Sequence, residues 1–275
     1  MHTKLIVFTD LDGTLLDHHT YAFDAALPAL KVLRERDIPL ILVSSKTRLE
    51  LLDYQKLFNL TNLPFVVENG AAIFTPLNYF DSLPDPVQIN HLTCYCLGKR
   101  FAEIKQVLNL ISKKYDYSIK GYHNATPEEI SVKTGLKGES LIRSLSREFS
   151  IPIFYDQHAD EILQKESETY NLQILYGGRF MHLLSKTDKG MALKLIMRGY
   201  QKKMPSKLIK SIALGDSLND FAMLEQADYS ILVKKHDGSF ESRARIENII
   251  YSPDIGPKGW NQSLLKIINL GGENE

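Results

Sequence analysis

Short, unbroken apolar runs alternate with amphipathic segments in the first part of the chain. After the run at residues 5–7, apolar residues of segment 21–36 recur every three or four positions, which predicts a helix. The apolar run at residues 38–43 is typical of a parallel strand covered on both faces. A helix over residues 48–60 and a strand over 64–67 follow. This succession predicts a doubly wound α/β fold with a mostly parallel sheet.

Prolines and polar residues interrupt this pattern between residues 76 and 86, which marks a candidate domain boundary. Beyond it, the pattern predicts strands at 91–97, 117–121, 151–155, 173–176 and 180–184, with helices at 99–114, 126 onward, 138–149 and 159–171. The first pattern resumes with a helix at 187–200, strands at 211–214 and 229–233, and a helix at 260–268. We therefore predict a core domain of residues 1–84 and 186–275, interrupted by an α+β domain of residues 85–185.

Composition limits the classes of partner. The chain has 33 basic and 33 acidic residues, so no overall field attracts nucleic acid or an anionic membrane, and we expect neither as a partner. The amino-terminal apolar run is too short for a signal peptide, and no apolar run approaches about 18 residues, which predicts a cytoplasmic protein. Cys94 and Cys96 lack the further ligands that a zinc site needs and are expected to be reduced, packed thiols.

Two carboxylates follow the first predicted strand. In extended backbone, Asp10 and Asp12 project to the same side, so both can face one small volume. Like charges this close repel each other unless a cation or a proton lies between them. The pair therefore indicates a metal site or acid–base chemistry.

Further polar groups are expected at the same edge of the sheet, because ligands of doubly wound sheets bind beyond the carboxyl ends of the strands. These groups are Ser44, Ser45, Lys189, Asp216, Asn219 and Asp220. Three aspartates form an oxygen-rich site that suits Mg²⁺, while hydroxyl, ammonium and turn N–H groups can bind phosphoryl oxygens. The combination predicts phosphoryl transfer.

The order of these motifs resembles that of the haloacid dehalogenase superfamily of phosphatases. The segments that carry the resemblance are Asp-Leu-Asp-Gly-Thr at 10–14, Ser-Ser at 44–45, Lys189, and Gly-Asp-Ser-Leu-Asn-Asp at 215–220. Segments 44–48, 68–74, 177–184 and 256–261 are similar to the mannosyl-3-phosphoglycerate phosphatase family within it. The resemblance implies that the inserted domain is a cap over the active site.

The resemblance also implies roles for the aspartates. Asp10 is expected to be the nucleophile, which forms an aspartyl-phosphate. Asp12 is expected to protonate the leaving oxygen and then to activate water. Mg²⁺ is expected to bind the Asp10 carboxylate, the backbone carbonyl of Asp12, and Asp216. Asn219 and Asp220 are expected to orient the ligands of the metal.

Phosphate binding is assigned in the same way to Lys189 and to one of the two serines, and spacing alone does not choose between Ser44 and Ser45.

Four residues are candidates for substrate binding. Glu68 and Asn69 follow a strand that ends near the phosphate. Arg179 could hold a glycerate carboxylate through two parallel hydrogen bonds, and His182 lies close to it in the sequence. Met181 stands where the family usually has tryptophan, which puts ring stacking on a sugar in doubt.

The prediction is a Mg²⁺-dependent phosphatase that hydrolyses a glycosyl-3-phosphoglycerate, with the mannosyl form preferred. The alternatives are a broader sugar phosphatase, a phosphohexomutase, or a phosphosugar-binding protein without catalysis.

Overall fold

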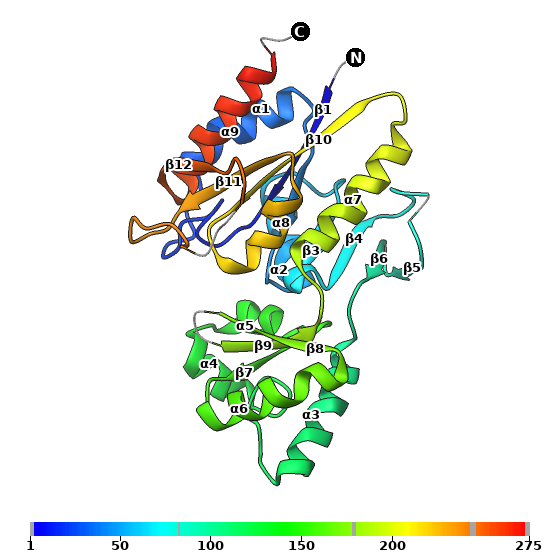
Figure 1. Cartoon of the computed structure of the whole chain (residues 1–275), viewed down its shortest axis with the longest axis vertical. Coiled ribbons are helices and arrows are strands. Elements are labelled where there is room, and N and C mark those ends of the chain that lie inside the picture. The colour runs from blue at the N-terminus through cyan, green and yellow to red at the C-terminus, as the bar shows by residue number, and fades with distance from the viewer. Residues whose placement is uncertain (1–2, 82, 178–179, 243–245, 273–275) are drawn as a thin grey trace.

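The computed structural model describes residues 3–81, 83–177, 180–242 and 246–272. Within these residues, nine strands form one sheet in the order β12-β11-β10-β1-β2-β3-β4-β6-β5 (Figure 1). The strands are β1 (Thr3–Thr9), β2 (Leu40–Val43), β3 (Phe65–Val67), β4 (Ala72–Pro76), β5 (Pro86–Ile89), β6 (Leu92–Cys96), β10 (Leu208–Gly215), β11 (Tyr229–Lys234) and β12 (Ile250–Ile255). Strands β12 to β3 are parallel, whereas β4, β6 and β5 add an antiparallel edge.

Helices cover both faces of this sheet, as the alternation of side chains along β1 requires. Val7 faces one apolar cluster, which is packed by α1 (Leu27–Glu35), α2 (Arg48–Leu57) and α9 (Gly256–Gly272). Ile6 and Phe8 face the other cluster, which is packed by α7 (Lys189–Lys203) and α8 (Phe221–Gln226). The doubly wound fold class is therefore confirmed.

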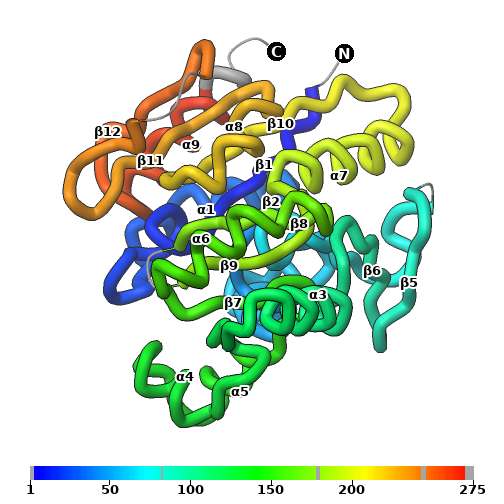
Figure 2. Tube along the Cα trace, turned by 60° about the horizontal axis from the view of Figure 1, so that its bottom comes forward, coloured from blue at the N-terminus to red at the C-terminus, as the bar shows by residue number. Residues whose placement is uncertain are grey.

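A second, antiparallel sheet lies beside the core (Figure 1). Its order is β7-β9-β8, formed by β7 (Ser150–Phe154), β8 (Leu172–Tyr176) and β9 (Phe180–Ser185). Helices α3 (Phe101–Tyr115) and α6 (Gln157–Glu166) pack on one of its faces. Two shorter helices, α4 (Pro127–Thr134) and α5 (Gly138–Leu145), complete this unit, which is called the cap below. Both chain ends lie on the side of the core away from the cap (Figures 1 and 2).

The edge of the large sheet differs from the sequence-based expectation. Strands β5 and β6 pair with the core sheet, although the sequence pattern places residues 85–97 in the insert. The chain crosses into the cap after β6 and returns after β9, and there the Lys99 backbone N–H donates to Ser185 Oγ at 2.7 Å. We therefore propose residues 99–185 as the extent of the cap.

Other elements were missed or misplaced. Strands β4, β5 and β12 were not predicted, because each is short or carries polar and proline residues. The strand expected at 117–121 is wrong: an isolated bridge joins Gly121 to Ile153. No helix among the described residues is long and apolar enough to cross a membrane.

Candidate active site

The site lies at the carboxyl ends of the parallel strands. Asp10 follows β1 and Asp216 follows β10, and β1 and β10 are paired side by side. Because neighbouring parallel strands end at one edge, residues far apart in sequence meet there. Asp10, Asp216 and Asp220 are buried, and one carboxylate oxygen of each lies within 4.8 Å of the others. The structure therefore brings together three of the aspartates that the sequence placed at this edge, and Asp12 is not one of them.

Lys189 lies between two of these carboxylates. Asp188 caps α7 by accepting from Met191 N–H, which places Lys189 in the first turn of the helix. The Lys189 ammonium, which is fully buried, donates to Asp10 Oδ1 and to Asp220 Oδ1, both at 2.6 Å. Three buried carboxylates thus lie around one ammonium group, which pairs with two of them. The local negative charge that remains favours a proton or a metal cation.

Further hydrogen bonds hold Asp216 and the second oxygen of Asp220. Thr14 Oγ1 donates to Asp216 Oδ1 at 2.9 Å. Asp220 Oδ2 accepts from the backbone N–H groups of Asp216 and Ser217, both at 3.0 Å. Because Lys189 contacts its other oxygen, Asp220 is held at both carboxylate oxygens, and its role in orienting metal ligands stays a prediction.

Burial controls the protonation of the acidic group. It raises the pKa of Asp10 to about 7 against the opposing effect of Lys189. It also raises the pKa of Asp216 well above its ordinary value, with Asp220 and Asp10 adding to the shift. Burial alone lowers the pKa of Lys189, but Asp10 and Asp220 outweigh it and raise that pKa. Oxygen donors of this kind fit Mg²⁺ or a similar hard cation.

We expect Mg²⁺ to stabilise the fold more at about pH 8 than at about pH 5.5. The raised pKa of Asp10 means that the folded chain binds a proton that the unfolded chain has lost. The contribution of this proton to the free energy of unfolding is fully present below about pH 4 and is lost as the pH rises through about 7. Above that pH, a divalent cation can replace the proton and, at a hundred times its Kd, stabilises by about 3 kcal/mol. Thermal unfolding with and without Mg²⁺ measures the effect, and equal shifts at both pH values would contradict it.

The Asp12 side chain lies outside the buried acidic group. Its Oδ2 pairs with Lys46 Nζ at 2.7 Å, and its Oδ1 is buried without a hydrogen-bond partner among the described residues. The Lys46 ammonium also lies over the rings of Tyr21 and Tyr54, at 5.3 and 5.8 Å from their centroids. Lys46 therefore fixes the direction of the Asp12 carboxylate. The sequence placed Lys46 in the Ser-Ser-Lys-Thr segment but gave no signal for this contact.

Both candidate serines lie at the end of β2. The Ser44 side chain is buried, and its Oγ accepts from the Lys46 backbone N–H at 3.2 Å. The carbonyl oxygen of Ser45 accepts from Arg147 Nη1 at 2.9 Å, and Arg147 belongs to the cap. The choice between Ser44 and Ser45 for phosphate stays a prediction. Arg147 was missed, because nothing in its local sequence marks it as a neighbour of β2.

Glu68 and Asn69 are already engaged by protein groups. The Glu68 carboxylate is fully buried and accepts from Glu148 N–H at 2.8 Å and from Ser150 Oγ at 2.6 Å. Asn69 Oδ1 accepts from Asn219 Nδ2 at 2.9 Å. In this arrangement Glu68 binds the cap, and Asn69 binds the loop that follows β10.

The cap residues divide between two faces of the small sheet. Met181 is buried in the cluster beneath α3 and α6, so that position faces away from His182, its neighbour on β9. His182 Nδ1 is buried without a partner in the described part of the chain. Burial, with Arg147 nearby, lowers the pKa of His182 to about 3 and keeps the ring neutral at pH 7. Arg179 lies outside the described residues.

Aromatic side chains lie on the His182 face of the small sheet. Phe180 is two residues from His182 on β9, and its ring lies 5.5 Å from that of Tyr122 and 5.9 Å from that of Phe154, measured between centroids. Met181 itself faces the apolar cluster, so whether the missing tryptophan affects ring stacking on a sugar stays a prediction. An aromatic residue is available on the other face.

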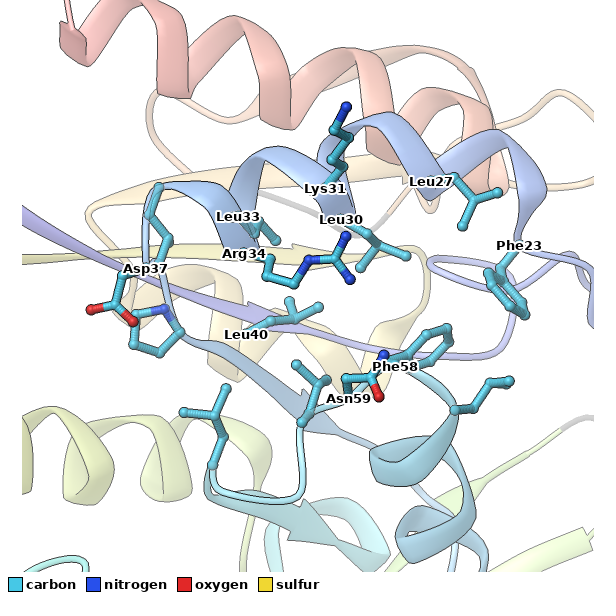
Figure 3. Close-up of a pocket in the computed structure, with 15 residues that line it drawn as sticks. Phe23, Leu27, Leu30, Lys31, Leu33, Arg34, Asp37, Leu40, Phe58 and Asn59 are labelled. Carbon is cyan, nitrogen blue, oxygen red and sulfur yellow. The ribbon is translucent and has the colours of Figure 1, made fainter.

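A cavity of about 500 Å³ lies elsewhere, between α1 and the end of α2. Phe23, Leu30, Arg34 and Phe58 are among the residues that line it (Figure 3). Leu40, at the start of β2, also lines it, so the cavity lies at the opposite end of that strand from Ser44. It is separate from the acidic group.

Comparisons with known proteins agree with this geometry. The sequence profile described as haloacid dehalogenase-like hydrolase matches residues 7–247. The chain is 37% identical over 268 residues to a Methanococcoides burtonii protein named glucosyl-3-phosphoglycerate/mannosyl-3-phosphoglycerate phosphatase, covering 96% of this chain and 97% of that protein. A Persephonella marina protein of the same name is 36% identical over 269 residues, with coverage of 96% and 97%.

Solved structures share the fold at lower identity. A Thermotoga maritima crystal structure matches with a TM-score of 0.66 and 16% identity, over 96% of this chain and 97% of that chain. A Thermoplasma acidophilum structure matches with a TM-score of 0.64 and 18% identity, over 97% and 99%. The likeness extends through core and cap together.

Proposed function

The chain belongs to the haloacid dehalogenase-like hydrolases, and we propose that it is a Mg²⁺-dependent phosphatase acting on glucosyl- or mannosyl-3-phosphoglycerate. One observation carries the chemistry: the buried group of Asp10, Asp216 and Asp220 around Lys189, at the carboxyl edge of the sheet. The substrate class rests on the identity of 37% over 96% of the chain to a phosphatase with that name.

In this mechanism Asp10 attacks phosphorus. Lys189 holds Asp10 Oδ1, which leaves the other carboxylate oxygen to form the new bond to phosphorus. The bond between phosphorus and the ester oxygen breaks, and that oxygen leaves with a proton from Asp12. The products of this step are the glycosylglycerate and an aspartyl-phosphate at Asp10.

The second half-reaction restores Asp10. Asp12 takes a proton from a water molecule whose oxygen attacks phosphorus, and the bond between phosphorus and Asp10 breaks to release inorganic phosphate. Lys46 keeps the Asp12 carboxylate pointed in one direction through both steps. A divalent cation held by Asp10, Asp216 and the Asp12 carbonyl would offset the charge on the phosphoryl oxygens.

A substrate panel tests this proposal. We expect phosphate release from glucosyl- and mannosyl-3-phosphoglycerate with a kcat/KM at least about 10-fold above that for hexose phosphates. We also expect this activity to disappear when a chelator removes divalent cations. Preference for hexose phosphates would favour a broader sugar phosphatase, and conversion between hexose phosphates would indicate a phosphohexomutase. Binding without phosphate release from any ester would indicate a phosphosugar-binding protein.

A further inference from the structure

The turn Glu68-Asn69-Gly70 after β3 has unusual backbone geometry. Its three residues have φ angles of +48°, +61° and +89° in succession. Glycine adopts such angles freely and asparagine tolerates them, whereas glutamate keeps them when surrounding contacts hold it in place. Strain of this kind is concentrated at functional sites. The contacts of Glu68 must therefore offset the strain of its backbone.

The first residue of the turn is attached to the cap. Both oxygens of the Glu68 carboxylate accept hydrogen bonds from consecutive cap residues: Glu148 N–H at 2.8 Å, Phe149 N–H at 3.2 Å and Ser150 Oγ at 2.6 Å. The Arg147 guanidinium lies 3.9 Å from the same carboxylate. No part of the Glu68 side chain is exposed to solvent. These contacts use three of the about four acceptor sites of the carboxylate, all of them on the cap side.

The rest of the turn is attached to the catalytic edge of the core. The backbone N–H groups of Glu68 and Asn69 donate to the carbonyl oxygens of Lys46 and Ser44 at 3.1 and 3.0 Å. Asn69 Oδ1 accepts from Asn219, in the loop that carries Asp216 and Asp220.

Gly70, the last residue of the turn, packs against the start of α7. A Cβ atom at Gly70 would lie 2.0 Å from the carbonyl oxygen of Asp188 and 2.8 Å from the backbone nitrogen of Lys189. The turn therefore packs directly against the start of α7, where the chain has just returned from the cap. A side chain at Gly70 would displace the helix that carries Lys189.

We propose that the turn of residues 68–70 fixes the position of the cap relative to the catalytic edge, with Glu68 as a positioning residue for the glycosyl-phosphoglycerate reaction. The inference rests on the proposed function, because a cap matters most for a substrate larger than its phosphate group. The arrangement links Glu148–Ser150 of the cap, through one turn, to the loops that bear Ser44 and Asn219 and to the start of α7, which bears Lys189. Glu68 touches no reacting atom and acts through these contacts.

The test compares two substrates in Glu68→Gln. An amide keeps the size of the side chain but replaces one acceptor oxygen with a donor that faces N–H groups. We expect kcat/KM for the glycosyl-3-phosphoglycerate to fall about 10- to 100-fold, mainly through KM, because small misplacements of binding groups have effects of this size. Hydrolysis of p-nitrophenyl phosphate, which needs Asp10 but little of the cap, should change less than about 3-fold.

Hydrogen exchange supplies a readout that does not depend on activity. In Glu68→Gln the Glu148 or the Phe149 amide should exchange faster than in the wild type, because each binds a different oxygen of Glu68 and one of these oxygens becomes an NH2 group. Ser150→Ala is the second variant, for use if Glu68→Gln fails to fold. It removes only the hydrogen bond from Ser150 Oγ to Glu68, so kcat/KM for the glycosyl-3-phosphoglycerate should fall more than that for p-nitrophenyl phosphate, by a smaller factor than in Glu68→Gln. Glu166→Gln is the matched control: this buried carboxylate binds Lys114 and Tyr115 within the cap.

Three results would overturn the proposal: equal loss on both substrates in a folded variant, unchanged kinetics, or unchanged exchange at residues 148 and 149. If the wild type does not hydrolyse glycosyl-3-phosphoglycerates, the proposed function fails, and exchange at these amides still decides whether Glu68 fixes the cap.

Discussion

Asp10→Asn is expected to abolish turnover, with kcat at least about 10⁴-fold below the wild type, while the chain stays folded. The amide cannot form the aspartyl-phosphate, so the reaction loses its first step. Folding should survive because the amide oxygen can still accept from Lys189, and Lys189 keeps its 2.6 Å pair with Asp220. The substitution also removes one of three buried like charges. Phosphate release and thermal unfolding, measured on the same preparation, check both parts.

Asp17→Asn is the control for this variant. Asp17 lies in the same loop but accepts hydrogen bonds from the nearby His19 and Thr20 N–H groups and has no contact with Lys189 in the structure. Its replacement should leave kcat within about 3-fold of the wild type. Residual activity of Asp10→Asn above about a hundredth of the wild-type rate would exclude Asp10 as the nucleophile.

Lys189→Met is expected to cost both stability and activity. The ammonium group is the cation shared by Asp10 and Asp220, and without it these buried carboxylates face each other unpaired. Removing one partner of a buried ion pair costs about 3–5 kcal/mol. We also expect kcat to fall about 10²- to 10³-fold, the effect of losing a donor that stabilises charge in the transition state.

The pH dependence of Lys189→Met distinguishes this electrostatic explanation from loss of packing. Burial already raises the pKa values of Asp10 and Asp216, and loss of Lys189 removes an opposing effect in each case. The variant should therefore be more stable at about pH 5, where protons neutralise the carboxylates, than at about pH 8. Lys114→Met, which breaks an ion pair of a half-exposed lysine with Glu166, should have a much smaller effect. A loss of stability that is the same at both pH values would point to packing.

The catalytic group could be predicted from sequence because its members follow parallel strands. Asp10, Lys189 and Asp216 each lie directly after a strand or at the start of a helix, so the fold pattern alone places them at one edge. The hydrogen bonds from Lys189 to Asp10 and Asp220 are then expected, because buried carboxylates need a cation as a partner.

The junction between core and cap could not be predicted in the same way. Glu68 resembles any acidic residue of an Asn-Gly turn, and its partners lie 80 to 82 residues later in the sequence. Arg147 reaches Ser45 across 102 residues without a motif that marks either one. Such contacts depend on how the cap is placed against the core. Hydrophobic periodicity predicts single helices and strands but carries no information about this placement. The same limit explains why residues 85–97, which pair with the core sheet, were expected in the insert.

The pairing of β1 with β10 sets the order in which the catalytic edge can be completed during protein synthesis. Asp10 is made early, but Lys189 follows 179 residues later and the Thr14 partner Asp216 lies 202 residues from it. Trp260, which donates to Thr9 Oγ1 at the end of β1, is 251 residues away. The cap is therefore fully synthesised before Asp10 can pair with the ammonium group of Lys189. A chain interrupted before β10 would carry Asp10 on a strand that pairs with β2 but lacks β10, and it would lack Asp216 and Asp220.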